Sequence, residues 1–226
     1  MKARQQTSFL FDLDGTLVDT VYDHVLAWHD ALQEEGIDVS VWRLHRKIGM
    51  SGGLFTKALA RETGRELNEE TVKRLGALHA KHYNARSART RPLPGASELL
   101  AFLTDNKIPW AIATSGRMRT AGPVLKILGV DPEKVPVVTR DMVRYAKPDP
   151  DLFLAAAEKA GVDIETACVV GDSIWDMLAA RRARALGIGL LSGGYGMEEL
   201  ERSGAYRVYE DPADLLAHID EVGGRR

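Results

Sequence analysis

The chain has a single cysteine, no long apolar run and almost no excess of charge of either sign. Cys168 cannot form an internal disulfide, and its place in the apolar run 167–170 predicts a buried core side chain rather than a nucleophile. No apolar run approaches the roughly 20 residues that cross a bilayer, and residues 1–7 lack the hydrophobic stretch of a secretory signal. We therefore expect a soluble, cytoplasmic protein that does not engage membranes.

The balance of charge argues against a polyanionic partner. The chain contains 30 Lys and Arg against 32 Asp and Glu, which gives a formal net charge of -2. Such a chain has no global basic field to hold a nucleic acid. Its 226 residues are 45% hydrophobic, enough to bury a sizeable core. We expect a monomer or a weak homodimer.

Two kinds of periodicity divide the chain. The short apolar run Ser8–Phe11 predicts a buried strand, whereas from there to about Pro92 apolar residues recur at helical spacing. After Pro92 strands alternate with helices, which favours a Rossmann-like α/β core with a parallel sheet. Strands are expected at 8–11, 110–113, 135–139, 167–170, 185–190 and 207–209, and helices at 96–106, 119–128 and 151–160. The core would comprise residues 1–19 and 92–226, and an inserted all-helical domain residues 20–91.

Acidic and hydroxyl side chains follow several of these strands. Asp12 and Asp14 come directly after the first strand, and Gly15 allows a sharp turn that leaves backbone N–H groups free. Alone, this motif is explained about as well by a solvated polar turn. Three further segments end other strands or lie in loops on the same side: 114–116, 147–149 and 172–176. Because the carboxyl ends of parallel strands share one edge of a sheet, the four segments are expected to converge on one site.

These four segments, in this order, resemble the four motifs of the haloacid dehalogenase superfamily, and the helical insert resembles its small helical cap. The resemblance covers nearly the whole chain, and its motifs are specific jointly. It implies that Asp12 attacks phosphorus and becomes an aspartyl phosphate, while Asp14 protonates the leaving oxygen and later activates water. The other implied roles are phosphate binding by Thr114, the backbone of Ser115 and Lys147, and metal binding by Asp12, the Asp14 carbonyl and Asp172, with Asp176 in support.

The chemistry of Mg²⁺ agrees with these implied roles. Mg²⁺ prefers oxygen ligands and is usually held by one or two carboxylates and a substrate phosphate, which suits Asp12 and Asp172. A carboxylate attacks a phosphoryl group only when the repulsion between anions is cancelled, which the metal, Lys147 and oriented N–H groups would do together. We therefore expect Mg²⁺-dependent hydrolysis of a small phosphorylated metabolite, as in phosphoglycolate-phosphatase-like members.

Other activities of the superfamily fit less well. Dehalogenases lack an acid two residues after the nucleophile, because halide leaves unprotonated, so Asp14 favours phosphoryl transfer. The closer rival is a β-phosphoglucomutase-like sugar phosphomutase, which the segment 19–28 resembles; there His24 would hold Asp14 away until the sugar binds. A mutase must also grip a second phosphate, and Gly52 stands where the mutases carry a cap arginine. A non-catalytic phosphate-binding scaffold is the alternative from another class, and the intact motifs argue against it.

Substrate choice is expected to depend on the helical insert. His24, Met50 and Ser51 are candidate specificity residues, although a plain packing role explains the histidine, and a flexible turn the other two, about equally well. His79 lies near the position of a cap lysine in the mutases. His79 and His82 are spaced to share a helix face, but the sequence pairs no acidic or cysteine ligand with them. They are predicted to be an exposed or packed pair rather than a metal site.

Overall fold

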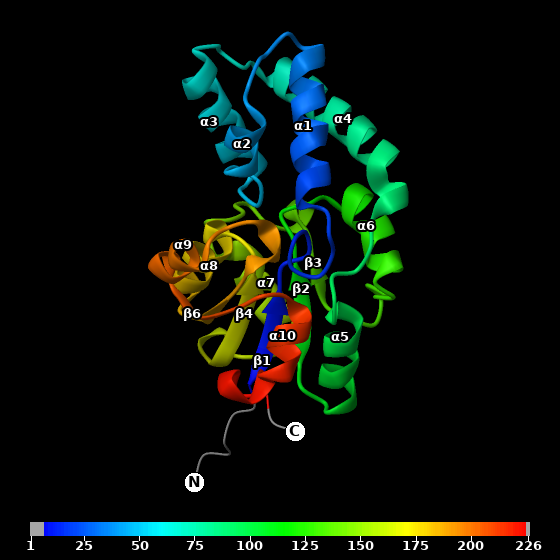
Figure 1. The fold of residues 1–226 in the computed structure, drawn as a ribbon, viewed down its shortest axis with the longest axis vertical. Coiled ribbons are helices and arrows are strands. Elements are labelled where there is room, and N and C mark those ends of the chain that lie inside the picture. Colours follow the sequence, from blue (N-terminus) through cyan, green and yellow to red (C-terminus); the bar gives the residue numbers. More distant parts are fainter. Residues whose placement is uncertain (1–6, 225–226) are drawn as a thin grey trace.

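The structure is a computed structural model that describes residues 7–224. It has a six-stranded sheet below a group of four helices (Figure 1). All strand pairs are parallel, in the order β3-β2-β1-β4-β5-β6. The strands are β1 (Ser8–Phe11), β2 (Trp110–Ala113), β3 (Val137–Val138), β4 (Ala167–Gly171), β5 (Leu186–Leu190) and β6 (Ala205–Tyr209). This arrangement confirms the predicted Rossmann-like α/β core.

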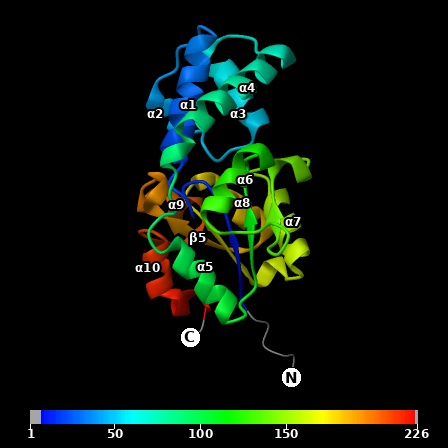
Figure 2. The same cartoon turned by 90° about the vertical axis from the view of Figure 1, so that its right-hand side faces the viewer.

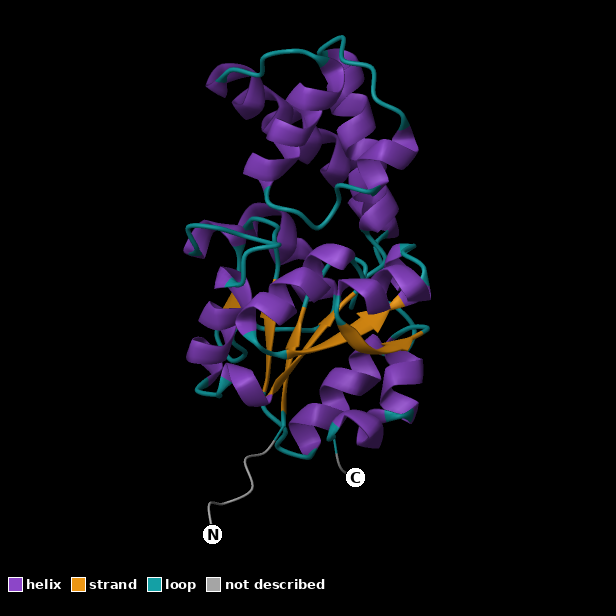
Figure 3. Ribbon diagram, turned by 90° about the vertical axis from the view of Figure 1, so that its left-hand side faces the viewer, coloured by secondary structure: helices purple, strands orange, loops and turns teal. Residues whose placement is uncertain are grey.

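Strand β1 shows how the sheet comes to be covered on both faces. Its side chains alternate: Phe9 and Phe11 pack among helices on one face of the sheet, whereas Leu10 packs among helices on the other face. All four residues of β1 are buried, as expected for a central strand of a parallel sheet. The helices of the core are α5 (Ala96–Asp105), α6 (Met118–Ile127), α7 (Asp151–Ala160), α8 (Ile174–Ala183), α9 (Met197–Ser203) and α10 (Pro212–Ala217). Figures 2 and 3 show helices on both sides of the sheet.

The helical insert has an apolar core of its own. Its helices are α1 (Val21–Glu34), α2 (Val41–His45), α3 (Gly52–Thr63) and α4 (Glu69–Arg86). Side chains from all four meet in one buried cluster that includes Val25, Leu44, Leu59 and Leu75. This cluster is distinct from the two that cover the sheet. We therefore propose that the cap domain comprises residues 20–91.

The two connections between cap and core run side by side. The backbone N–H of Asp19 donates to the carbonyl of Arg91 at 3.0 Å, and the N–H of Leu93 donates to the carbonyl of Leu17 at 2.9 Å. Between these two bonds Val18 and Pro92 form an antiparallel bridge. The chain thus leaves the core and returns to it at the same point.

The edges of the sheet differ most from the sequence prediction. Strand β3 has two residues where 135–139 were expected, because it pairs with β2 on one side only and Pro136 cannot donate to a ladder. At the opposite edge β6 begins at Ala205, two residues before the expected start. The central strands β1 and β2 and helix α7 have the predicted bounds.

The structure bears on two sequence predictions, the role of Cys168 and the lack of a membrane-spanning segment. Cys168 is 2% exposed, and burial raises the pKa of its thiol to about 12, so it is a core side chain rather than a nucleophile. Within residues 7–224, no helix is both long enough and apolar enough to span a bilayer.

Candidate active site

Lys147 lies at the centre of the acidic cluster. Its side chain is fully buried, and its ammonium group contacts Oδ1 of Asp12 and lies 2.7 Å from Oδ1 of Asp176. Burial alone would lower the pKa of Lys147, but the two carboxylates outweigh it and raise the pKa above its ordinary value. The lysine therefore stays charged beside Asp12, which follows β1 directly.

Asp12, Asp172 and Asp176 form a buried carboxylate cluster that suits a cation. One oxygen from each lies within 4.8 Å of the others. Burial, together with the charges of neighbouring carboxylates, raises the pKa of Asp12 to about 7 and that of Asp172 well above its ordinary value. Lys147 supplies one positive charge against these three acids. A divalent cation would offset the remaining repulsion, and an all-oxygen donor set matches the preference of Mg²⁺.

Asp176 is held by the first turn of α8. One of its oxygens accepts hydrogen bonds from the backbone N–H and the hydroxyl of Ser173, at 3.1 and 2.5 Å, while the other faces Lys147. The Ser173 hydroxyl in turn accepts from the N–H of Asp176, which completes a capping box. Both oxygens of Asp176 are thus engaged within the cluster, and Asp12 and Asp172 remain the candidate metal ligands.

The glycine turn after β1 packs directly against Asp172. Gly15 has a φ of +84°, and a Cβ at this position would lie 2.6 Å from Oδ2 of Asp172. The next residue, Thr16, donates its hydroxyl to Oδ1 of Asp172 at 2.9 Å. Only glycine allows both this backbone conformation and this approach. The turn therefore brings the ends of β1 and β4 together.

Asp14 lies in a separate hydrogen-bond network, beside the connection from the core to the cap. Its Oδ1 accepts from the hydroxyl of Thr20 at 2.7 Å and lies 3.2 Å from Nε2 of His24, and its Oδ2 lies 3.4 Å from the hydroxyl of Thr114. Burial would raise the pKa of Asp14, but the contacts with His24 and Thr20 outweigh it and hold the pKa below its ordinary value. A carboxylate can only accept, so His24 donates to Asp14 through Nε2.

His24 is itself held by cap helix α4. Its Nδ1 lies 3.0 Å from Nε2 of His79, and its ring stacks on Tyr83 with centroids 4.0 Å apart. Burial lowers the pKa of His79 well below its ordinary value, so His79 is neutral. His82, one turn along, contacts Glu34 at 2.7 Å. The two histidines thus have separate partners. The prediction that no acidic side chain pairs with them was wrong for His82, because Glu34 of α1 lies opposite it across the cap.

Thr114 and Ser115 lie at the end of β2, beside the cap loop. Thr114 is fully buried, and its hydroxyl accepts from the N–H of Gly116 at 2.9 Å. The hydroxyl of Ser115 donates to the carbonyl of Gly49 at 3.0 Å, so it joins core to cap. Of the candidate cap residues, His24 and Met50 line the cavity. Ser51 is not among the lining residues; its N–H donates to the carbonyl of Lys147 at 2.8 Å, and its hydroxyl caps α3.

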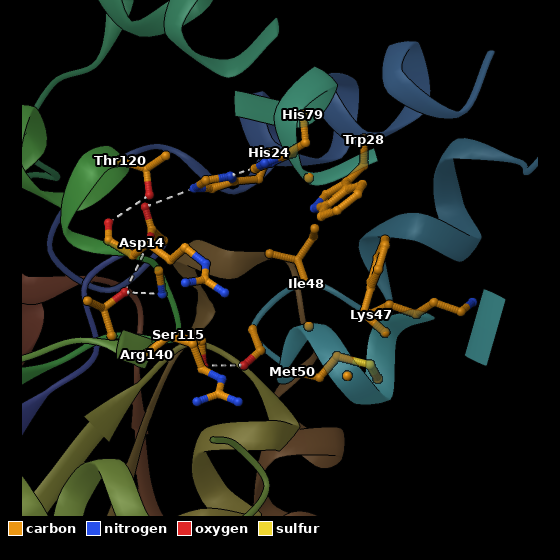
Figure 4. Close-up of a pocket in the computed structure, with 18 of the residues that line it drawn as sticks. Asp14, His24, Trp28, Lys47, Ile48, Met50, His79, Ser115, Thr120 and Arg140 are labelled. Carbon is orange, nitrogen blue, oxygen red and sulfur yellow. Dashed lines mark hydrogen bonds and ion pairs between the residues drawn. The ribbon is translucent and has the colours of Figure 1, made fainter. Parts of the chain in front are cut away.

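A cavity of about 340 Å³ opens between this site and the cap. Figure 4 places Ser115 and Arg140 of the core on one side of it, and Trp28, Ile48 and Met50 of the cap on the other. Asp12, Asp14, Asp172, Thr114 and Ser115 all line the cavity. These predicted acids and hydroxyls therefore face one partly open cavity whose apolar wall the cap supplies, whereas Asp176 and Lys147 are not among its lining residues.

Comparison with known proteins agrees with this geometry. Residues 7–184 match the haloacid dehalogenase-like hydrolase family. The chain belongs to that family. It is 34% identical over 186 residues to a phosphoglycolate phosphatase of Agrobacterium fabrum, covering 81% of this chain and 80% of the relative. It is 27% identical over 214 residues to an N-acetylmuramic acid 6-phosphate phosphatase of Pseudomonas putida, covering 94% and 96%. The crystal structure of a hydrolase from Pseudomonas syringae is 57% identical, with a TM-score of 0.95, and the match covers 97% and 100% of the two chains.

Several residues at the site of this haloacid dehalogenase-like hydrolase were not predicted from the sequence. Thr20 contacts Asp14, and Arg119 and Arg140 line the cavity from the core side. The two arginines follow β2 and β3, at the same edge of the sheet as the acidic motifs. Their position after strand ends was the available signal. The contact of His79 with His24 had no such signal, because 55 residues separate them.

Proposed function

We propose that this hydrolase is a Mg²⁺-dependent phosphatase that cleaves small phosphomonoesters through an aspartyl phosphate on Asp12. The observation that carries the proposal is the buried contact of Asp12 with Lys147, next to the carboxylate of Asp172 and open to the cavity. A carboxylate kept beside a permanent cation can approach an anionic phosphoryl group. Phosphoglycolate and N-acetylmuramic acid 6-phosphate, named for two relatives, are candidate substrates.

The positions of the side chains suggest a separate role for each of them in the reaction. An oxygen of Asp12 attacks phosphorus, and Lys147 offsets the charge that gathers there. Asp14 is a carboxylate in its contacts with Thr20 and His24, so it must first take up a proton to protonate the leaving oxygen. As a carboxylate again, it then takes one from the water that hydrolyses the acyl phosphate. His24 and Thr20 hold Asp14 in place. When bound, Mg²⁺ would be held by Asp12 and Asp172 and would supply Lewis-acid stabilisation of the phosphoryl oxygens.

The requirement for a cation can be tested directly. We expect the purified protein to release p-nitrophenol from p-nitrophenyl phosphate with Mg²⁺ and to lose this activity in excess chelator, because three buried acids face one lysine. Adding back Mg²⁺ should restore the rate. Full activity in the chelator would contradict the role given to the cation, and inactivity on every phosphate tested would favour the scaffold alternative.

Cation binding should also depend on pH. The pKa of Asp12 is raised to about 7, by burial first, so below that pH a proton competes with the metal. The Mg²⁺ concentration that gives half-maximal activity should therefore rise as pH falls from 8 to 6, by up to about tenfold per pH unit below the pKa for each proton displaced. Titration calorimetry with Mg²⁺ at the same pH values provides a check independent of turnover. A half-saturating concentration that stayed constant would show that Asp12 does not bind the metal.

A sugar phosphomutase remains the alternative, because His24 contacts Asp14 as expected for that activity. A mutase needs cationic cap groups for a second phosphate. In this chain Gly52 occupies the position of the arginine, and His79 is neutral and engaged with His24. With β-glucose 1-phosphate and a catalytic amount of glucose 1,6-bisphosphate, we therefore expect free phosphate and no appreciable glucose 6-phosphate. Formation of glucose 6-phosphate much faster than phosphate would support the mutase instead.

A further inference from the structure

The cavity is larger than a two-carbon leaving group requires. Its volume of about 340 Å³ falls within the range of ordinary small-molecule sites. Trp28, Met50, Phe55 and Val72 give it an apolar wall on the cap side. Glycolate would fill only a fraction of this space. An alcohol of the size of a sugar, with an apolar face, fits it better.

The core side of the cavity carries a positive charge without a matching acid. Of the cations that line the cavity, Arg117 of the core pairs with Asp141, and Lys47 of the cap lies 2.6 Å from Glu62, so these two are matched by acids. Neither Arg140 nor Arg119 pairs with a carboxylate among residues 7–224. The guanidinium of Arg140 donates to the carbonyls of Val143 and Arg144, whereas Nη2 of Arg119 donates to the carbonyl of Gly76 at 3.1 Å. The remaining N–H groups of Arg119 are available to a ligand.

Arg119 also stands where the cavity continues outward. A second, more open cleft between α4 and α6 shares four lining residues with the cavity: Val72, Gly76, Arg117 and Arg119. Asp12 and Asp14 do not compensate Arg119, because they contact Lys147 and His24. A group held by Arg119 would therefore lie at the end of the leaving alcohol that is far from phosphorus.

We propose that the substrate is a phosphomonoester of a sugar-sized alcohol that also carries a carboxylate, with its body against Trp28 and Phe55 and its carboxylate on Arg119. A guanidinium can bind either a carboxylate or a phosphate through two N–H donors, but the single charge of Arg119 balances a carboxylate fully and a phosphate dianion only in part, so a carboxylate suits this position better. The inference rests on the proposed phosphatase activity and adds the class of substrate.

Two sugar phosphates provide a matched test. N-acetylmuramic acid 6-phosphate differs from N-acetylglucosamine 6-phosphate only by the lactyl ether that bears a carboxylate. We expect kcat/KM to be higher for the first by about tenfold or more, the effect of one charge-assisted hydrogen bond. In Arg119→Gln the ratio of the two kcat/KM values should fall to about one, with the larger loss on N-acetylmuramic acid 6-phosphate. Arg119→Lys should keep part of the preference, because it keeps the charge.

The controls separate this inference from the proposed function. Arg202→Gln removes an exposed arginine of α9 that pairs with Glu198, and it should leave the preference intact. Equal kcat/KM for the two sugar phosphates, or faster hydrolysis of phosphoglycolate than of either, would overturn the inference in an enzyme that still cleaves p-nitrophenyl phosphate. So would an Arg119→Gln variant that slows both sugars equally. Inactivity on all of these compounds with Mg²⁺ would overturn the phosphatase proposal itself.

Discussion

Replacing Asp12 with asparagine is expected to lower turnover by at least about 10⁴-fold, as expected for loss of a catalytic nucleophile, and to leave the fold intact. An amide cannot form the acyl phosphate, so no later step of the mechanism can proceed. Hydrolysis of p-nitrophenyl phosphate measures the effect, and circular dichroism checks the fold. Mass spectrometry must show that the asparagine has not deamidated back to aspartate.

The matched control for this variant is Asp105→Asn. Asp105 ends α5 at an exposed position away from the cavity, so the same chemical change there should leave activity at the wild-type level. Turnover of Asp12→Asn comparable to wild type, once deamidation is excluded, would remove Asp12 from the mechanism.

Lys147→Met should cost both activity and stability. Removing the ammonium group leaves Asp12 and Asp176 buried without their cation, which typically costs about 3–5 kcal/mol, or roughly 6–20 °C in Tm for a chain of this size. The loss should be larger at pH 8 than at pH 5.5. The pKa of Asp12, already raised to about 7, rises further without Lys147, so at low pH the carboxyl is protonated and the unpaired charge disappears.

Thermal unfolding of both proteins at the two pH values measures this effect, with Arg182→Met as the control. The side chain of Arg182, on α8, is 51% exposed and pairs with Asp149, which lies in the same loop as Lys147. Removing the guanidinium should therefore lower the free energy of unfolding by at most about 1 kcal/mol. A Tm of Lys147→Met equal to that of wild type at pH 8 would show that the ammonium group does not stabilise the acidic cluster.

The sequence predicted the centre of the fold better than its edges. Strand β1 reads as a short apolar run because it is buried on both faces, and it ends where the acidic motif begins, so its bounds could be predicted. The edge strand β3 also read as an apolar run, but its length depends on a single neighbour and on Pro136. Pairing of that kind is a tertiary property that local patterns do not contain.

The same distinction applies to the site. Asp12, Asp172 and Lys147 belong to short motifs at strand ends, and the topology of a parallel sheet is enough to bring such ends together. His79 and Arg119 reach the cavity only because the cap lies over the core in one particular orientation. That orientation depends on many side-chain contacts between cap and core, among them the bond from Ser115 to the cap carbonyl of Gly49. The periodicity of the sequence does not encode these contacts.

The paired linkers at Val18 and Pro92 also bear on how the chain folds. Phe9 pairs with Trp110, so the central strands must meet across the whole helical insert. Contacts at such sequence separation are slow to form, because the loop between them must first be closed. Once the cap helices have packed on their own core, the two ends of the insert lie together, and the loop that remains to be closed is short. We expect the cap to fold as a unit and thereby to bring β1 close to β2.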